Sequence, residues 1–212
     1  MGNKARNTRS RALYPVSRLR FSIPSPLRPF TPLRLSFVLL ASLLLAACQP
    51  APGPPRLLVD DSVAPDFEAL AQETWQDFLA AFPARTDCFG DVRLQATPDL
   101  PSRAAYDPGP AAVSVRVPGA PAFLQSGLVH EWAHHLERQC PEHVQLRPIF
   151  LAAQGLPPDA DWFHGESWAS TPSEQYAEAV VVLVLGRRAV STKAFLTQEA
   201  VQVVRAWAQG QP

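Results

Sequence analysis

The sequence predicts an α+β domain in which a small sheet of two to four strands packs against helices. Apolar residues recur with helical spacing in four segments, and they alternate with strand spacing in two others. The chain has 212 residues, of which 47% are hydrophobic. This length and composition suit one ordinary domain with a buried core and argue against a chain that is disordered throughout.

The first half of the predicted domain contains strands and one helix. Residues 57–59 are expected to form a short strand, and residues 66–82 carry one apolar stripe at helical spacing. Residues 91–97 and 111–117 alternate between apolar and polar side chains, as half-buried strands do. The proline-rich stretch 98–110 between them is expected to be a loop. The second of these strands could hold an extended peptide at its edge, or it is simply half of a hairpin.

Helices dominate the second half of the predicted domain. Residues 122–139 form an amphipathic helix that ends before Pro141. Residues 146–170 are expected to be irregular, with two turns that contain proline. A further helix is expected over 172–186, and a last amphipathic helix covers about 192–208.

The first 47 residues have the features of an export signal. They contain eight of the 19 basic residues and none of the 19 acidic ones. Residues 35–47 are an uncharged apolar run, which is shorter than the ~20 residues that a membrane-spanning helix needs. A basic segment followed by a short apolar segment and small residues is typical of a secretory signal peptide.

The end of this segment, Leu45-Ala46-Ala47-Cys48, resembles the lipobox of bacterial lipoproteins. The resemblance implies cleavage before Cys48, a diacylglyceryl thioether on its sulfur and acylation of the new amino terminus. It predicts an exported protein that is anchored by lipid to the bacterial cell membrane or outer membrane. The alternative is an ordinary signal peptide with a chance cysteine. Residues 48–55 would then be a proline-rich tether, and residues 56–212 the folded domain.

The composition after residue 47 bears on the class of partner and on the redox state of the cysteines. This part holds 11 basic and 19 acidic residues, a net charge of −8, which argues against nucleic acid as the main partner. It also holds two cysteines, Cys88 and Cys140. In an oxidising compartment such a pair is expected to form a disulfide, and two buried thiols are the alternative.

One motif points to metal chemistry. The helix predicted over 122–139 contains His130-Glu131-Trp132-Ala133-His134, which places two imidazoles one turn apart on the same face. Both can then bind a single Zn²⁺ at about 2.0–2.1 Å. Glu131 lies beside the metal without binding it, where a general base can take a proton from a zinc-bound water. Two structural histidines on an ordinary helix are the alternative.

A catalytic zinc needs a third protein ligand. Glu174 and Glu178 are four residues apart and share one helix face, so one can bind zinc while the other supports a zinc-bound histidine. Glu174 is preferred as the ligand because Glu178 then remains for the supporting role. Thr171-Pro172-Ser173-Glu174 also fits a capping box, in which case Glu178 would be the ligand. The other candidates along the chain are His143, Asp161, His164 and Glu166.

The two motifs together resemble the gluzincin metallopeptidases. His130–His134 is followed about forty residues later by Glu174-x-x-x-Glu178, and the short order of elements is similar to the one-domain members called minigluzincins. The resemblance covers roughly residues 90–190 and implies one zinc ion, with the first acid as ligand and the second supporting a ligand histidine. In the thermolysin-like members the second motif begins with Asn and its second acid is Asp, whereas Ser173 precedes Glu174 here.

A peptidase also needs a hydrogen-bond donor near the developing oxyanion. His164, in the aromatic loop 161–165, is the first candidate, and the others are Tyr176 and, more remotely, Tyr106. The alternative is that His164 is simply a surface residue of that loop. Two other histidines, His135 and His143, are expected to lie at the surface because neither has ligand spacing with a second partner.

These observations predict a membrane-anchored zinc metallohydrolase, and more narrowly a peptidase that acts on peptides or proteins. Glu131 would activate the water and then pass its proton to the leaving amine. A lipoprotein that serves as a binding module or scaffold, with a structural or degenerate zinc site, is the first alternative. A hydrolase that uses the same zinc chemistry on another kind of bond is the second.

Overall fold

The computed structural model describes residues 53–188 and 193–211. The chain divides into two units, and the second, Ala51–Pro212, contains all of these residues. The predicted signal segment and Cys48 lie outside the described residues. Within the part of the chain that is described, no helix is both long enough and apolar enough to cross a bilayer.

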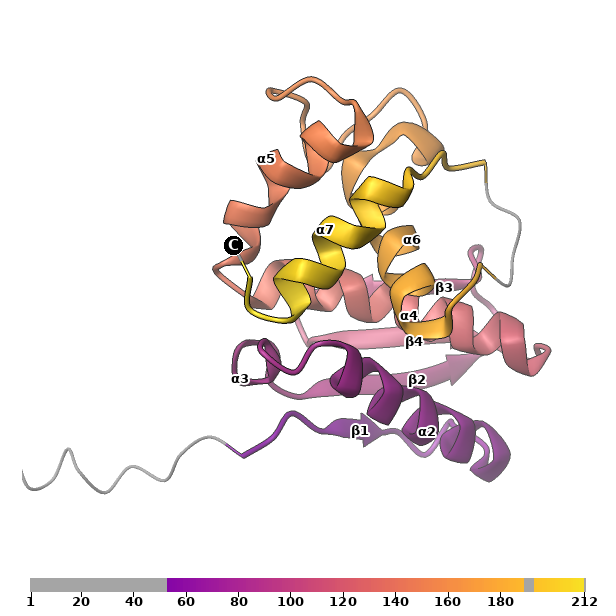
Figure 1. Cartoon of the computed structure of the whole chain (residues 1–212). Coiled ribbons are helices and arrows are strands. Elements are labelled where there is room, and N and C mark those ends of the chain that lie inside the picture. The colour runs from indigo at the N-terminus through magenta and orange to yellow at the C-terminus, as the bar shows by residue number, and fades with distance from the viewer. Residues whose placement is uncertain (1–52, 189–192, 212) are drawn as a thin grey trace, which may run out of the picture. The chain divides into compact units, whose positions relative to one another are not determined.

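A mixed sheet of four strands forms one layer of the molecule (Figure 1). Its strands are β1 (Leu57–Val59), β2 (Val92–Thr97), β3 (Ala104–Asp107) and β4 (Ala112–Arg116), in the order β1-β2-β4-β3. The first three in this order are parallel, and β3 is antiparallel to β4. With helices packed on this sheet, the predicted α+β class is confirmed.

The strand β3 corrects the prediction that residues 98–110 form only a loop. Ala104 pairs with Val115 and Asp107 with Ala112, so β4 is paired on both sides and offers no free edge. The edge expected at β4 therefore belongs to β3. Four residues between prolines are too few to give a periodic pattern, and this strand is defined by its pairing with β4 rather than by its own sequence.

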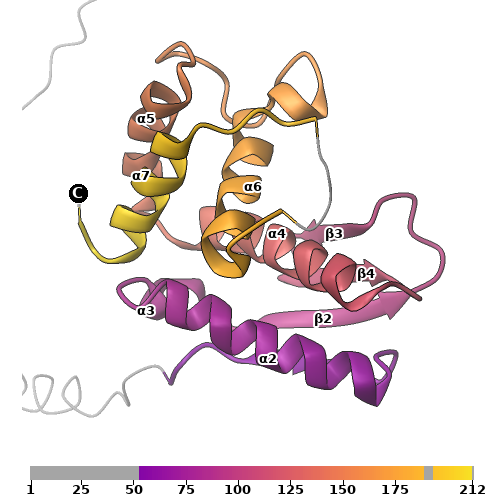
Figure 2. The same cartoon turned by 45° about the vertical axis from the view of Figure 1, so that its right-hand side comes forward.

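Two helices cover one face of the sheet, as Figure 2 shows. They are α2 (Pro65–Ala81) and α4 (Pro121–Gln139), which contact each other as well as the strands. The helices pack on the apolar residues of β2 and β4, whereas the alternating Arg93 is exposed. A cluster of aromatic rings from α2, from the short helix α3 (Thr86–Phe89) and from α4 fills this interface: Trp75, Phe78, Phe89 and Trp132.

Three further helices lie on the side of α4 away from the sheet (Figures 1 and 2). They are α5 (His143–Gln154), α6 (Pro172–Leu185) and α7 (Gln198–Ala208), with the 3₁₀ turn η1 (Trp168–Ser170) before α6. The helices α5 and α6 contact α4, and α7 packs on α5 and α6. The prediction of irregular structure from residue 146 is wrong as far as Gln154, where α5 ends. Pro148 lies inside this helix and not in a turn. The last helix also begins later than expected, at the N-cap Thr197, whose side chain accepts the Ala200 N–H.

The predicted disulfide is present in the structure. Cys88 of α3 is bonded to Cys140, the residue that follows α4. The bond ties the end of the motif-bearing helix to α3, and Pro141 stops the helix at the same place. At the end of α6, Gly186 adopts a left-handed conformation with φ of 70°, which a side chain would disfavour.

The two histidines expected at the surface, His135 and His143, are buried instead, which corrects that prediction. His143 lies among aromatic rings of α6 and α7, including those of Tyr176 and Trp207. Each imidazole occupies a packed site between elements that are distant in the sequence, so helical spacing alone gave no sign of it.

Candidate metal centre

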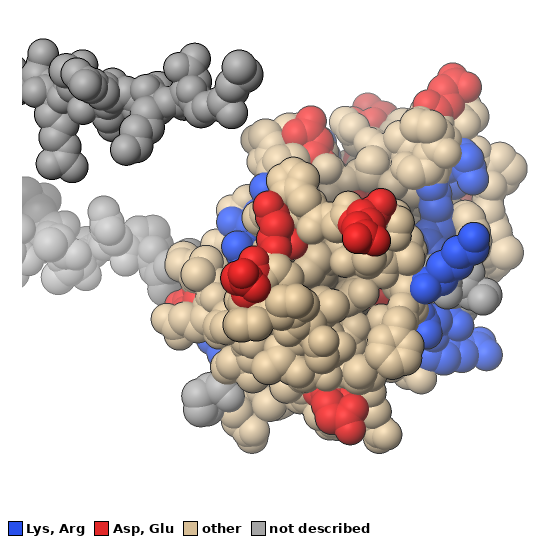
Figure 3. Space-filling view, turned by 90° about the horizontal axis from the view of Figure 1, so that it is seen from above, with Lys and Arg blue, Asp and Glu red and all other residues tan. Residues whose placement is uncertain are grey.

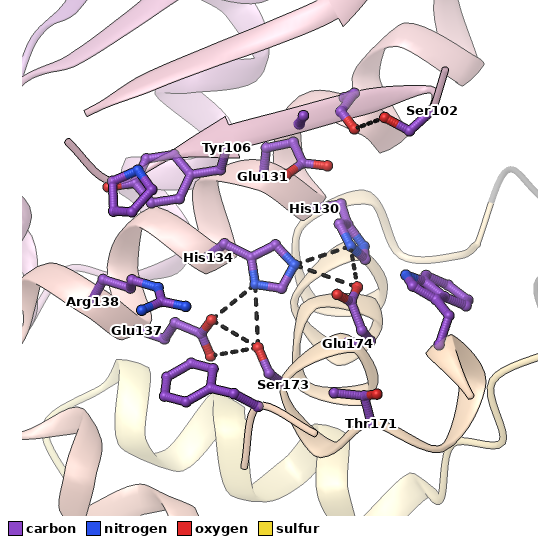
Figure 4. Close-up of a pocket in the computed structure, with 15 residues that line it drawn as sticks. Ser102, Tyr106, His130, Glu131, His134, Glu137, Arg138, Thr171, Ser173 and Glu174 are labelled. Carbon is purple, nitrogen blue, oxygen red and sulfur yellow. Dashed lines mark hydrogen bonds and ion pairs between the residues drawn. The ribbon is translucent and has the colours of Figure 1, made fainter. Parts of the chain in front are cut away.

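Two helices bring the predicted ligands together, as Figure 4 shows. His130 and His134 project from the same face of α4, one turn apart. The helix α6 crosses this face at its first turn, where Pro172 occupies the first helical position and Glu174 follows. The site therefore depends on the packing of α4 against α6, which is extensive.

Three ligand atoms converge at this crossing. The Nε2 atom of His130 lies 2.9 Å from Oε2 of Glu174 and 3.2 Å from Nε2 of His134, which is itself 3.4 Å from the same carboxylate oxygen. Ligands of a tetrahedral zinc ion, each about 2.0–2.1 Å from the metal, would be about 3.3 Å apart. The group of His130, His134 and Glu174 can thus hold a metal ion, and its nitrogen and oxygen donors suit Zn²⁺.

The capping box considered for Glu174 does not form. The side chain of Thr171 makes no cap hydrogen bond to α6 and instead donates to the carbonyl of Ser167. The carboxylate of Glu174 faces the two imidazoles, so among the described residues Glu174 is the third member of the cluster. This arrangement favours Glu174 over Glu178 as the ligand.

The second nitrogen of His130 meets the other acid of the predicted pair. Its Nδ1 lies 3.2 Å from Oε1 of Glu178, which is almost fully buried one turn along α6. The guanidinium of Arg103, 3.9 Å from the same oxygen, partly balances the buried charge. Such a bond fixes the tautomer of His130 and directs Nε2 toward the metal position.

The second nitrogen of His134 is held by Glu137, a residue that the sequence analysis missed. Glu137 is buried, and its carboxylate accepts from His134 Nδ1 at 2.9 Å, from the Ser173 hydroxyl at 2.8 Å and from Trp162 Nε1 at 2.7 Å. The spacing of three residues between His134 and Glu137 on one helix could have indicated this pair. Ser173 and Trp162 come from distant segments, and nothing in the local sequence indicates their part.

The predicted base, Glu131, faces the same cavity as the three ligands. The cavity has a volume of about 390 Å³ and is lined by residues of β3, α4 and the start of α6. Only 8% of Glu131 is exposed, and this burial raises the pKa of its carboxyl. Figure 4 shows its carboxylate between Tyr106 and His130, on the β3 side of the site.

The ligand cluster attracts positive charge. Burial acts to lower the pKa of His134, but its hydrogen bonds with Glu137 and Glu174 raise that pKa to about 10. The pKa of Glu174 is lowered: burial acts to raise it, but its bonds to His130 and His134 prevail. A divalent cation would supply this positive charge in place of protons on the imidazoles.

An indole ring closes one side of the site. Trp168, on the turn η1, stacks on the imidazole of His130 with ring centres 5.9 Å apart, and 44% of its surface is exposed. Hydrogen bonds between Ser167 and Ser170 hold this turn. Gly165 lies so close to the backbone of Ser170 and Thr171 that a Cβ there would clash, which keeps the loop against the site.

The expected oxyanion donors are not brought to the metal position. His164 is exposed, with its ring 3.1 Å from Asp161, and it does not line the cavity. Tyr176 is fully buried on the far side of α6, among the rings of His143, Phe150 and Trp162, and likewise does not line the cavity. Neither position supports the role that was expected of it.

Tyr106 does line the cavity, but its hydroxyl proton is donated to His135. Nε2 of the buried His135 lies 2.9 Å from the carbonyl of Phe89, which can only accept, so this nitrogen carries the proton. Burial lowers the pKa of His135 to about 4, which keeps the ring neutral. Its Nδ1 therefore accepts from the hydroxyl of Tyr106 at 2.9 Å, and the Tyr106 oxygen offers the cavity an acceptor rather than a donor.

Comparisons of the chain with protein-family models, with curated proteins and with solved structures found no significant match. The function must therefore be inferred from the geometry of this site.

Proposed function

We propose that this protein is a zinc-dependent peptidase. The observation that carries the proposal is the convergence of His130, His134 and Glu174 on one point in a cavity that Glu131 also lines. Two nitrogens and one carboxylate oxygen leave a fourth tetrahedral position open, which is the pattern of catalytic rather than structural zinc sites.

The residues around the metal position divide the work of hydrolysis. A zinc ion held there would polarise the substrate carbonyl and acidify a water molecule. Glu131 takes one proton from the water as its oxygen bonds to the carbonyl carbon, and it delivers that proton to the amine nitrogen as the C–N bond breaks. Glu178 and Glu137 keep the two imidazoles in the orientation that the metal requires.

A peptide substrate is supported by the free edge of β3. The Arg116 N–H donates to the carbonyl of Arg103, so residues 103, 105 and 107 direct their backbone groups toward β4. Ala104 and Tyr106 therefore direct theirs away from the sheet, and both residues line the cavity. Ser102 already binds the Ala104 carbonyl, which leaves the Ala104 N–H and both backbone groups of Tyr106 for an extended chain.

The charge distribution also fits a peptide better than a nucleic acid. On the face seen in Figure 3, basic side chains gather mainly on the right-hand side, with a smaller group on the left, and acidic side chains are scattered over the face. The net charge of −8 after residue 47 gives no general attraction for phosphate.

We further propose that lipid on Cys48 anchors the protein outside the cytoplasm, and Cys48→Ala should then move it from the membrane to the soluble fraction.

The decisive experiment compares full-length wild type with Glu131→Gln. Both proteins should contain one zinc ion by elemental analysis. The wild type should cleave unstructured peptides, detected as new ends by mass spectrometry, and Glu131→Gln should be about 10²–10⁴-fold slower. Glu199→Gln, an exposed substitution of the same kind on α7, should behave as wild type. Zinc-loaded wild type that cleaves no peptide would favour the binding or scaffold alternative and refute the proposal.

A further inference from the structure

Arg138 places an uncommitted positive charge in the cavity. It lies one turn after His134 on α4, it is exposed, and it lines the same cavity as Glu131 and Glu174. Among the described residues, it has no hydrogen bond or ion pair from its side chain. Its neighbour Glu137 is fully engaged with His134 and the residues around it.

The guanidinium of Arg138 is nevertheless held in place. Its Cζ lies 4.3 Å from the centre of the Phe163 ring, which also lines the cavity. Arg147 approaches the same ring at 5.0 Å. Burial lowers the pKa of Arg147, the carboxylate of Glu137 acts to raise it, and the neighbouring cation Arg138 acts to lower it. This end of the cavity is therefore a preformed site for an anionic group.

The geometry of β3 indicates which part of a peptide would reach Arg138. Gly127 of α4 faces Arg103 and Ala104, whose side chains come within 3.5 Å of where its Cβ would be, while Tyr106 reaches His135 further along the helix. The strand and the helix thus run in the same direction. Figure 4 accordingly shows Ser102 at one end of the site, with Tyr106 and Arg138 at the other.

A peptide that pairs antiparallel with β3, the more stable and more common arrangement, would run against both elements. Its N-terminal part would lie at Arg138. The helix rises about 6 Å from His134 to Arg138, and an extended chain advances about 3.3 Å per residue, so Arg138 lies about two residues before the bond at the metal.

We propose that Arg138 makes the enzyme prefer an acidic side chain about two residues N-terminal to the cleaved bond. This inference rests on the peptidase function proposed above. A planar guanidinium binds a carboxylate through two parallel hydrogen bonds, and the amide of Gln cannot replace that charge. Since Arg138 is exposed, we expect only about a two- to five-fold preference for Glu over Gln.

The test uses a labelled peptide series of one sequence, with Glu, Gln or Lys placed at successive positions. Binding to zinc-loaded, full-length Glu131→Gln is measured by fluorescence anisotropy, and cleavage is measured with the wild type. One position should favour Glu, and Arg138→Gln, introduced into each background, should abolish that preference. Arg138→Glu should transfer the preference to Lys. Arg205→Gln, which removes an exposed charge from α7, should leave it intact.

Equal binding of the Glu and Gln peptides, or a preference that survives in Arg138→Gln, would overturn the inference. Cleavage without any charge preference would overturn it while leaving the peptidase function in place. Conversely, charge-selective binding that depends on Arg138 but is never followed by cleavage would refute the peptidase function and leave Arg138 as the anchor of an acidic-peptide binding site.

Discussion

The carboxylate of Glu137 offers a sharp test of how the metal centre is organised. Glu137 accepts hydrogen bonds from His134, Ser173 and Trp162. In Glu137→Gln only one of the two terminal atoms can still accept. If the amide oxygen faces His134, the NH₂ group opposes the N–H of Trp162, and the reverse orientation leaves His134 without an acceptor.

The expected losses follow from this geometry. A hydrogen bond to a charged group contributes about 1.5–3 kcal/mol, and loss of the acceptor that orients a ligand histidine weakens metal binding about 10- to 100-fold, or about 1.4–2.7 kcal/mol. We therefore expect the zinc dissociation constant of Glu137→Gln to rise by that factor. The free energy of unfolding in chelator should fall by about 1–3 kcal/mol, because one buried N–H loses its partner.

Two measurements check these values. Zinc affinity is obtained by competition with a chelating dye, and stability by urea denaturation in the presence of EDTA. Glu142→Gln is the matched control, because this glutamate is exposed just before α5. If Glu137→Gln bound zinc as tightly as the control, the carboxylate would not be orienting His134, and the reasoning from Nδ1 contacts would be refuted.

Two further predictions concern the stability of the fold. Burial lowers the pKa of His143 to about 3. The unfolded chain therefore takes up a proton below its pKa of about 6.5 while the folded protein does not, and stability should fall by up to about 1.4 kcal/mol per pH unit from pH ~6.5 toward pH ~3. In His143→Gln this contribution should vanish, and an unchanged slope in urea titrations at several pH values would contradict it. The Cys88–Cys140 bond spans 52 residues, and its replacement by Cys88→Ala/Cys140→Ala should lower the unfolding free energy by up to about 4 kcal/mol. An unchanged urea midpoint would contradict this, because it would show that the disulfide does not restrict the unfolded chain.

The parts of the site that lie on one helix could be predicted from the sequence. The spacing of His130 and His134 requires only helical geometry, and α4 forms where its apolar stripe indicates. The spacing of Glu174 and Glu178 predicts a pair for the same reason, and the two acids contact different nitrogens of His130. Local periodicity is enough wherever one element supplies both members of a pair.

The parts that depend on contacts between elements could not be predicted in this way. The strand β3 exists because Ala104–Asp107 pair with β4, and its own residues show no clear alternation. The roles of Ser173 and Trp162 depend on a fold that brings them to Glu137. The aromatic loop 161–165 predicts that His164 reaches the site, but the ring of Phe163 packs against Arg138 and Arg147, and His164 stays exposed beside Asp161.

The two imidazoles of the site are held by carboxylates from different helices, and this determines how each responds when α6 moves relative to α4. Glu137 shares α4 with His134, so that contact depends less on α6, which reaches Glu137 through Ser173. Glu178 lies on α6 with Glu174, so both contacts of His130 change together when the helices separate. The opposite side of α4 is anchored by Trp132, packed edge-on against Trp75 with ring centres 4.9 Å apart. Metal affinity should accordingly respond more to substitutions at the α4–α6 contact than to equally destabilising ones at the contact of α4 with α2.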